Sequence, residues 1–256
     1  MTYRAVLFDL FDTLVSFDRA RLPELTIKGK VVRSTAGKLY EAFHPFAPGL
    51  DLADFVDGLM WSWQEAERLR NEDYREVAAP ERLAMLVRRL GFDPAALGPE
   101  AMPTLLATHM RELSKAVVFP PHHGPLLRSL RPRYRLAVVS NFDYTPTAMG
   151  VLEREGIAGL FETIVVSDEV GWRKPKPFIF ELALGRLGLD AADALFVGDR
   201  IDIDVAGAQG VGMGSVWINP DRAPLPPDVQ PPDYEIRDLA ELGPILGISS
   251  GPARIT

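Results

Sequence analysis

Short apolar runs that end in a small or acidic residue constrain the fold of this 256-residue chain most strongly. The four clearest are AVLFDL (5–10), RLAVVSN (135–141), TIVVSD (163–168) and ALFVGD (194–199), and GSVWIN (214–219) and YEI (234–236) follow. These runs are apolar throughout instead of alternating, which is typical of parallel strands buried on both faces. Helical patterns separate them over 147–157, 176–189 and 202–212. The alternation predicts an α/β fold with a Rossmann-like, doubly wound parallel sheet.

A long helical stretch interrupts this pattern directly after the first predicted strand. The apolar residues of GKLYEAF, DLADFVDGLMWSWQEAERLRN, APERLAMLVRRLGF and EAMPTLLATHMRELSKAV recur at helical spacing. The Pro/Gly-rich junction FPPHHGP (119–125) then leads into the second strand. We therefore predict an α/β core formed by residues 1–16 and 119–256, with an all-helical cap domain inserted at residues 17–118.

Charge and composition narrow the possible partners. The net charge of −7 argues against a nucleic-acid or anionic-membrane partner, since either would favour a basic face. No run approaches the roughly 20 apolar residues that a membrane helix needs. The chain has no cysteine, which excludes disulfides and agrees with a reducing compartment. We expect a cytoplasmic monomer or homodimer that acts on a small molecule.

Polar residues follow the predicted strands where each strand ends. Asp9, Ser140 and Asp199 occupy such positions, and ligands of open α/β sheets bind at the carboxyl ends of the strands. A carboxylate can act as a nucleophile and form an aspartyl-phosphate. A lysine, a hydroxyl and a bound Mg²⁺ can neutralise the charge of the phosphate that it attacks. Mg²⁺ prefers oxygen ligands, which two or three carboxylates and a backbone carbonyl supply.

The ordered motifs FDLFDTL, VVSNFD, GWRKPKP and FVGDRIDID resemble those of the haloacid dehalogenase superfamily, in the branch whose helical cap follows the first motif. The resemblance extends over nearly the whole chain, from residue 6 to residue 242. It implies that Asp9 is the nucleophile and a Mg²⁺ ligand. It implies also that Ser140 binds the transferring phosphoryl group and that Lys174 balances its charge. Asp199 is then a metal ligand, supported by Asp204 or joined by it as a further ligand.

The same resemblance assigns roles to three more residues. The residue two positions after the nucleophile gives its backbone carbonyl to the metal, and here that residue is Phe11. Thr13 completes the first motif and, with Asn141 of the second, is expected to contact the substrate. A cap of this kind is expected to close over the site and supply contacts that select the substrate.

Phe11 is also the main departure from the family pattern. Most phosphatases of the superfamily carry an aspartate there, which protonates the leaving group, and phenylalanine cannot do this. The superfamily's 2-haloacid dehalogenases carry an aromatic residue at this position and use no metal, because halide leaves without a proton. Their second motif is Ser-Asn, as Ser140-Asn141 is here.

The fourth motif discriminates between these two readings. Dehalogenases lack its metal-binding acid, whereas this chain has Asp199, Asp202 and Asp204. Carboxylates clustered near Asp9 raise one another's pKa unless a cation is present. The motif therefore favours a Mg²⁺-dependent hydrolase of small phosphomonoesters that works through an aspartyl-phosphate on Asp9. The alternatives are a metal-independent 2-haloacid dehalogenase and a catalytically weak binding protein.

Two adjacent histidines lie outside these motifs, in the junction after the cap. His122 and His123 point in different directions because they are neighbours in sequence, and the chain has only two other histidines and no cysteine. From the sequence we expect a hinge here and no metal site.

Overall fold

The chain forms two compact units in this computed structural model, which describes residues 3–27 and 29–248. One is an α/β unit of residues 3–16, 119–142 and 152–248. The other is a helical unit of residues 17–118 and 143–151, apart from residue 28. The helical unit thus includes residues 143–151, which the sequence-based division assigns to the core. The boundaries drawn from the sequence stay a prediction.

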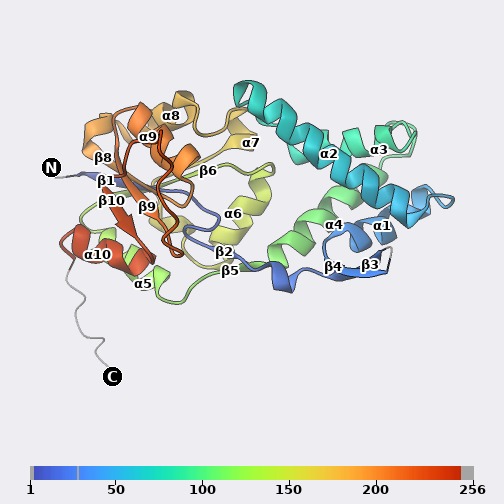
Figure 1. The fold of residues 1–256 in the computed structure, drawn as a ribbon, viewed down its shortest axis with the longest axis horizontal. Coiled ribbons are helices and arrows are strands. Elements are labelled where there is room, and N and C mark those ends of the chain that lie inside the picture. Colours follow the sequence, from blue (N-terminus) through green and yellow to red (C-terminus); the bar gives the residue numbers. More distant parts are fainter. Residues whose placement is uncertain (1–2, 28, 249–256) are drawn as a thin grey trace. The chain divides into compact units, whose positions relative to one another are not determined.

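A six-stranded, parallel sheet organises the α/β unit and confirms the predicted fold class (Figure 1). Its strands, in spatial order, are β10 (Tyr234–Ile236), β9 (Gly214–Ile218), β8 (Ala194–Gly198), β1 (Ala5–Phe8), β6 (Arg135–Ser140) and β7 (Thr163–Val166). The side chains of β1 and β8 are buried without exception, and those of β6 are nearly so. This burial on both faces is the reason for the uninterrupted apolar runs in the sequence.

The helices of the α/β unit connect these strands, and Figure 1 shows α8 and α9 on one side of the sheet and α5 and α10 on the other. The helices are α5 (His123–Leu130), α7 (Ser167–Val170), α8 (Pro177–Leu187), α9 (Ala206–Gly210) and α10 (Leu242–Ile245). Helix α8 packs on the sheet through Ile179, Phe180 and Ala183, all fully buried. Helix α6 (Thr145–Arg154) contributes to both units.

The sheet reverses its direction of growth next to β1. The chain runs outward from β1 to β6 and β7, then returns to β8 on the other side of β1. Such a switch point opens a crevice at the carboxyl ends of the two central strands, where α/β proteins bind ligands. Because Phe8 is in register with both Val138 and Val197, the residues after β1, β6 and β8 emerge at one edge.

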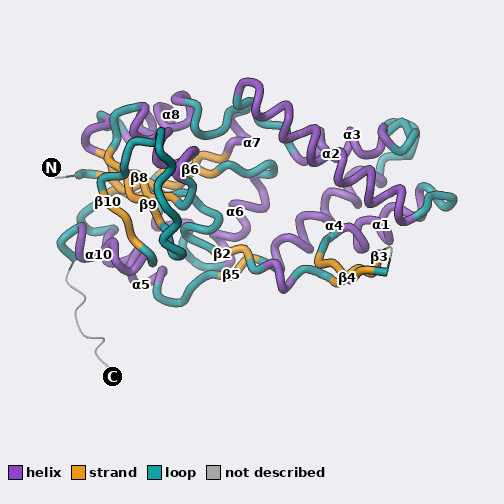
Figure 2. Tube along the Cα trace, in the orientation of Figure 1, coloured by secondary structure: helices purple, strands orange, loops and turns teal. Residues whose placement is uncertain are grey.

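The helical unit contains the four helices that the sequence predicts within residues 17–118 (Figure 2). They are α1 (Ala36–Phe43), α2 (Leu52–Asp73), α3 (Ala79–Arg89) and α4 (Ala101–Lys115). Buried apolar residues including Leu39, Phe55 and Leu86 form a core of its own. Of the helices within the described residues, none is long and apolar enough to cross a membrane.

The helical unit also contains an antiparallel hairpin that the sequence analysis missed. Strands β3 (Glu24–Ile27) and β4 (Lys30–Arg33) form it. Both strands are mostly exposed, with Val31 and Val32 facing solvent, so they lack the apolar run of a buried strand. Two further short strands, β2 (Ser16–Phe17) and β5 (Val117–Val118), pair with each other.

Candidate active site

A tight turn after β1 presents Asp9 at the carboxyl edge of the sheet. The Asp9 N–H donates to the Val197 carbonyl at 2.9 Å and so continues the pairing with β8 beyond the strand. The chain then turns back through Asp12, whose φ of 61° lies in the left-handed region. Aspartate tolerates this conformation better than most residues because its short side chain can bond locally. The Asp9 side chain remains 10% exposed, hence almost fully enclosed.

Lys174 connects two of the predicted site carboxylates. Its Nζ lies 2.6 Å from Asp9 Oδ1 and 2.7 Å from Asp204 Oδ1, and the side chain is 1% exposed. Burial alone would lower the pKa of Lys174, but the carboxylates of Asp204 and Asp9 outweigh it and raise the pKa. Lys174 therefore stays cationic and counters the negative charge at the strand end.

The fourth motif folds so that Asp204 reaches this lysine. Residues Ile201–Val205 form a single π-helical turn, a feature often found at functional sites. Asp204 Oδ2 accepts the Arg200 N–H at 3.0 Å. Position 198 must be glycine because a Cβ there would lie 2.4 Å from the Asp204 side chain. Asp202, by contrast, is exposed and pairs with Arg200 at 3.0 Å.

Asp9, Asp199 and Asp204 form a cluster, with one carboxylate oxygen of each within 4.8 Å of the others. Burial raises the pKa of Asp9 to about 6 against the lowering effect of Lys174, and Asp204 raises it further. Burial, followed by repulsion from Asp9 and Asp204, raises the pKa of Asp199 to about 7. Crowded oxygen donors whose charge is only partly compensated suit a hard divalent cation such as Mg²⁺. The residues present therefore fit the metal that the family resemblance implies.

This carboxylate cluster predicts how stability depends on pH in metal-free protein. The raised pKa values of Asp9 and Asp199 mean that the folded state binds more protons than the unfolded state between about pH 4 and pH 7. Their contribution to the free energy of unfolding therefore falls as pH rises through this window, by an amount on the order of several kcal/mol. The free energy of unfolding, measured by denaturant titration in the presence of EDTA at pH 5 and at pH 8, gives this difference.

Other groups titrate in the same range, so the comparison needs matched variants. Asp199→Asn should gain stability relative to the parent protein at pH 8 and much less at pH 5. Asp202→Asn removes an exposed carboxylate of the same motif and should leave the pH dependence unchanged. If the stability of the parent protein and that of Asp199→Asn depended on pH in the same way, the pKa of Asp199 would not be raised in the folded state.

Two buried hydroxyls complete the polar set near the strand ends. Ser140 is fully buried at the end of β6, and Thr13 is 4% exposed in the turn after β1. Neither Ser140 Oγ nor Thr13 Oγ1 has a hydrogen-bond partner within residues 3–27 and 29–248. Buried polar atoms are rarely left without partners, so such hydroxyls are well suited to bind an anionic oxygen. Their contact with a substrate stays a prediction.

Asn141 has a positioning role that the sequence did not indicate. Its Oδ1 accepts the Lys174 N–H at 2.8 Å, and its Nδ2 donates to the Lys174 carbonyl at 3.0 Å. This two-point contact fixes the backbone of the lysine that pairs with Asp9. The contact between Asn141 and a substrate stays a prediction.

Phe11 lines the same cavity as the carboxylates and stacks on an aromatic neighbour. Its ring centroid lies 4.6 Å from that of Phe142, with an interplanar angle of 29°. The cavity, about 200 Å³, is lined by Asp9, Phe11, Asp12, Asn141, Arg173, Lys174, Asp199, Arg200, Ile203 and Asp204. Whether the Phe11 carbonyl reaches a metal stays a prediction.

Sequence reasoning missed four residues of this site. Arg173, Arg200 and Ile203 line the cavity, and Phe142 supports the Phe11 ring. Each is the immediate neighbour of a motif residue, which was the only sequence signal available. The two arginines bring cationic groups to a cavity that must accept an anion if the substrate is a phosphate ester.

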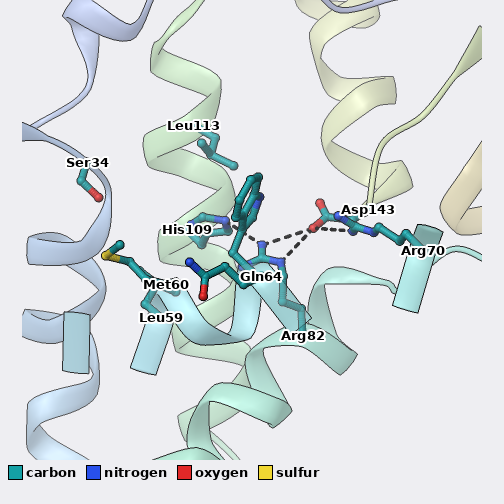
Figure 3. Close-up of a pocket in the computed structure, with 10 residues that line it drawn as sticks. Ser34, Leu59, Met60, Gln64, Arg70, Arg82, His109, Leu113 and Asp143 are labelled. Carbon is teal, nitrogen blue, oxygen red and sulfur yellow. Dashed lines mark hydrogen bonds and ion pairs between the residues drawn. The ribbon is translucent and has the colours of Figure 1, made fainter. Parts of the chain in front are cut away.

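A larger cavity of about 410 Å³ lies within the helical unit (Figure 3). Its apolar lining is formed by Leu59, Met60, Trp63 and Leu113. Two polar residues, Ser34 and Gln64, also line it. Met60 and Trp63 are more than half exposed, unusually so for such large apolar side chains. The cavity can therefore bind an apolar or aromatic group.

Buried charges form the polar side of this second cavity. Arg70 and Arg82 both point toward Asp143, at 3.5 and 3.2 Å (Figure 3). Arg82 also donates to His109 Nε2 at 3.0 Å, and burial, aided by Arg82, lowers the pKa of His109 to about 4. Arg70 is paired further with Glu76 at 2.9 Å. The network holds these groups in place, because an unpaired buried charge is strongly destabilising.

Comparisons with known proteins agree with the motifs. The chain is 29% identical to the glyceraldehyde 3-phosphate phosphatase of Methanopyrus kandleri, over 93% of this chain and 95% of the relative. The solved structure of the HAD-hydrolase YfnB from Bacillus subtilis, bound to magnesium, covers 97% of this chain and 100% of its own, with 25% identity and a TM-score of 0.65. The solved structure of the 2-haloacid dehalogenase of Pseudomonas syringae pv. Tomato covers 96% of this chain and 99% of its own, with 25% identity and a TM-score of 0.64.

The model of the haloacid dehalogenase-like hydrolase family matches residues 3–212, which is most of the chain. This match confirms the resemblance read from the motifs and shows that the protein is an enzyme. The sequence relatives favour a phosphatase over a dehalogenase. The family match agrees with the parallel sheet and with the cluster of Asp9, Asp199 and Asp204 that Lys174 joins. The chain therefore belongs to the haloacid dehalogenase-like hydrolases.

Proposed function

We propose that this hydrolase cleaves small phosphomonoesters in a Mg²⁺-dependent reaction through an aspartyl-phosphate on Asp9. The observation that carries the proposal is the cluster of Asp9, Asp199 and Asp204, whose carboxylate oxygens lie within 4.8 Å of one another. Halide displacement needs no such cluster, whereas phosphoryl transfer benefits from a cation held beside the nucleophile. The phosphatase names of the sequence relatives support the same substrate class.

In the first step, the ionised Asp9 carboxylate attacks phosphorus and the bond from phosphorus to the leaving oxygen breaks. Lys174 stays protonated and limits the repulsion between Asp9 and the phosphate. The hydroxyls of Ser140 and Thr13 donate to phosphoryl oxygens, a role suited to buried groups without another partner. Water then attacks the phosphorus of the aspartyl-phosphate, the bond from phosphorus to the Asp9 oxygen breaks, and inorganic phosphate leaves while a proton of the water passes to solvent.

Asp9, Asp199 and Asp204 would hold the Mg²⁺, with the Phe11 carbonyl as a further ligand. When bound, the ion neutralises phosphate charge and orients the phosphoryl group for in-line attack. Asp199 and Asp204 come from the end of β8 and the π-helical turn after it, so they approach Asp9 from the neighbouring strand.

Phe11 cannot protonate the leaving group, so the site favours substrates whose leaving group needs little help. Aryl and acyl phosphates meet that condition. A water molecule, or Asp12, which also lines the cavity, would supply the proton for less acidic alcohols.

The test is an assay of 4-nitrophenyl phosphate and 2-chloropropionate, each with Mg²⁺ and with EDTA. We expect phosphate release from 4-nitrophenyl phosphate with Mg²⁺ and no release with EDTA. Without the cation, the negative charge of the aspartate cluster repels the phosphate. The aromatic Phe11 and the Ser140-Asn141 pair favour the dehalogenase alternative, which predicts halide release insensitive to EDTA. Turnover of neither substrate would indicate the catalytically weak binding protein.

A further inference from the structure

A second group of metal-ligating side chains lies in the α/β unit, apart from the aspartate cluster. His122 directly precedes α5, His123 begins it, and Asp238 follows β10. One ligand atom from each residue lies within 4.8 Å of the other two. The two histidines, which the sequence treats as diverging neighbours, thus share a third residue that is more than 100 positions away.

The tautomer of His123 is the one that many metal-binding histidines hold. This residue is 5% exposed, and its Nδ1 lies 2.8 Å from the Leu14 carbonyl, which can only accept, so Nδ1 carries the proton. The unprotonated nitrogen of the neutral ring is therefore Nε2. Metal-binding histidines usually donate their other ring N–H to a carbonyl or carboxylate in this way.

His122 and Asp238 supply the accessible side of the group. His122 Nε2 lies 2.9 Å from Asp238 Oδ1, and about half of each side chain is exposed. Asp238 is held in place because its Oδ1 also accepts the Ala240 N–H at 2.8 Å, as the cap of a short helix. Because about half of each side chain is exposed, an ion can reach these atoms from solvent.

We propose that His122, His123 and Asp238 bind one divalent transition-metal ion of the Zn²⁺ class, with water completing the coordination. Two imidazoles and one carboxylate form a donor set that suits Zn²⁺ or Ni²⁺ and not Mg²⁺, which prefers oxygen ligands alone. The ion joins the start of α5 to the segment after β10. Through His123 it also secures Leu14, five residues after the nucleophile.

The experiment measures Zn²⁺ binding by calorimetry, in the whole chain carrying Asp199→Asn and with excess Mg²⁺ in the buffer. This background suppresses Zn²⁺ binding at the aspartate cluster, so the result does not depend on the phosphatase proposal. We expect one Zn²⁺ per chain and a rise in the thermal unfolding temperature on binding. No Zn²⁺ binding in this background would overturn the proposal.

Two variants locate the ion, and one serves as the matched control. His122→Ala and Asp238→Asn should each weaken Zn²⁺ binding at least about tenfold, the low end of what losing even an outer partner of a metal ligand costs. Both should fold, since His122 is exposed and asparagine can replace aspartate as a helix cap. His44→Ala removes an exposed histidine of the helical unit and should leave the Zn²⁺ affinity unchanged. Equal affinity in all three variants would place the ion outside this group.

Discussion

Replacing Asp9 by asparagine is expected to reduce phosphate release by at least about 10⁴-fold, the scale on which removing a catalytic nucleophile acts. The amide keeps the size of the carboxylate and an oxygen that can accept from Lys174, but it cannot form the covalent phosphoryl intermediate. Steady-state assays with 4-nitrophenyl phosphate and Mg²⁺ measure the loss.

This result would be informative because the variant should remain folded. Asp9 is a buried acid whose pKa is raised to about 6, so a neutral side chain relieves repulsion within the cluster. Thermal unfolding in EDTA at pH 8 should therefore show a stability at least equal to that of the parent protein. Asp202→Asn, the same change at an exposed carboxylate outside the cluster, is the control and should keep most of the activity. If Asp9→Asn kept a tenth of the activity, Asp9 would not be the nucleophile.

Replacing Phe11 by aspartate is expected to raise turnover of phosphate esters with poor leaving groups by about 10²–10⁴-fold, the usual contribution of a positioned general acid. Phe11 lines the cavity that contains Asp9, so a carboxyl group at this position lies in the same space. Turnover of 4-nitrophenyl phosphate should change little, because its leaving group needs no proton. The ratio of turnover numbers for an alkyl and an aryl phosphate measures the effect.

Asparagine at position 11 separates proton donation from the loss of the ring. Phe11→Asn removes the same stacking on Phe142 as Phe11→Asp and has nearly the same size, but it cannot donate a carboxylic proton. Both variants should lose about 0.5–1.5 kcal/mol of stability from the aromatic contact, in addition to its buried area. Only the aspartate variant should gain activity on alkyl phosphates. An equal gain in both would mean that Phe11 acts by obstructing the cavity.

Local patterns were sufficient to predict most of the fold. The six strands of the sheet begin where the apolar runs begin, because a strand covered on both faces must be apolar throughout. The helices of the helical unit follow from apolar residues at helical spacing. The hairpin of β3 and β4 was not predicted, because its strands are mostly exposed and bury too few apolar side chains to produce such a pattern.

The sequence by itself determined which chemical groups this protein has and in what order: a nucleophile, a hydroxyl, a lysine and paired acids, with a phenylalanine where an acid is expected. Only the tertiary structure decided which groups meet. It placed Lys174 between Asp9 and Asp204, used Asn141 to hold that lysine, and brought Asp238 to His122. The physical reason is that the order of strands and the helix packing set contacts between distant residues, whereas sequence patterns report mainly on burial within one element.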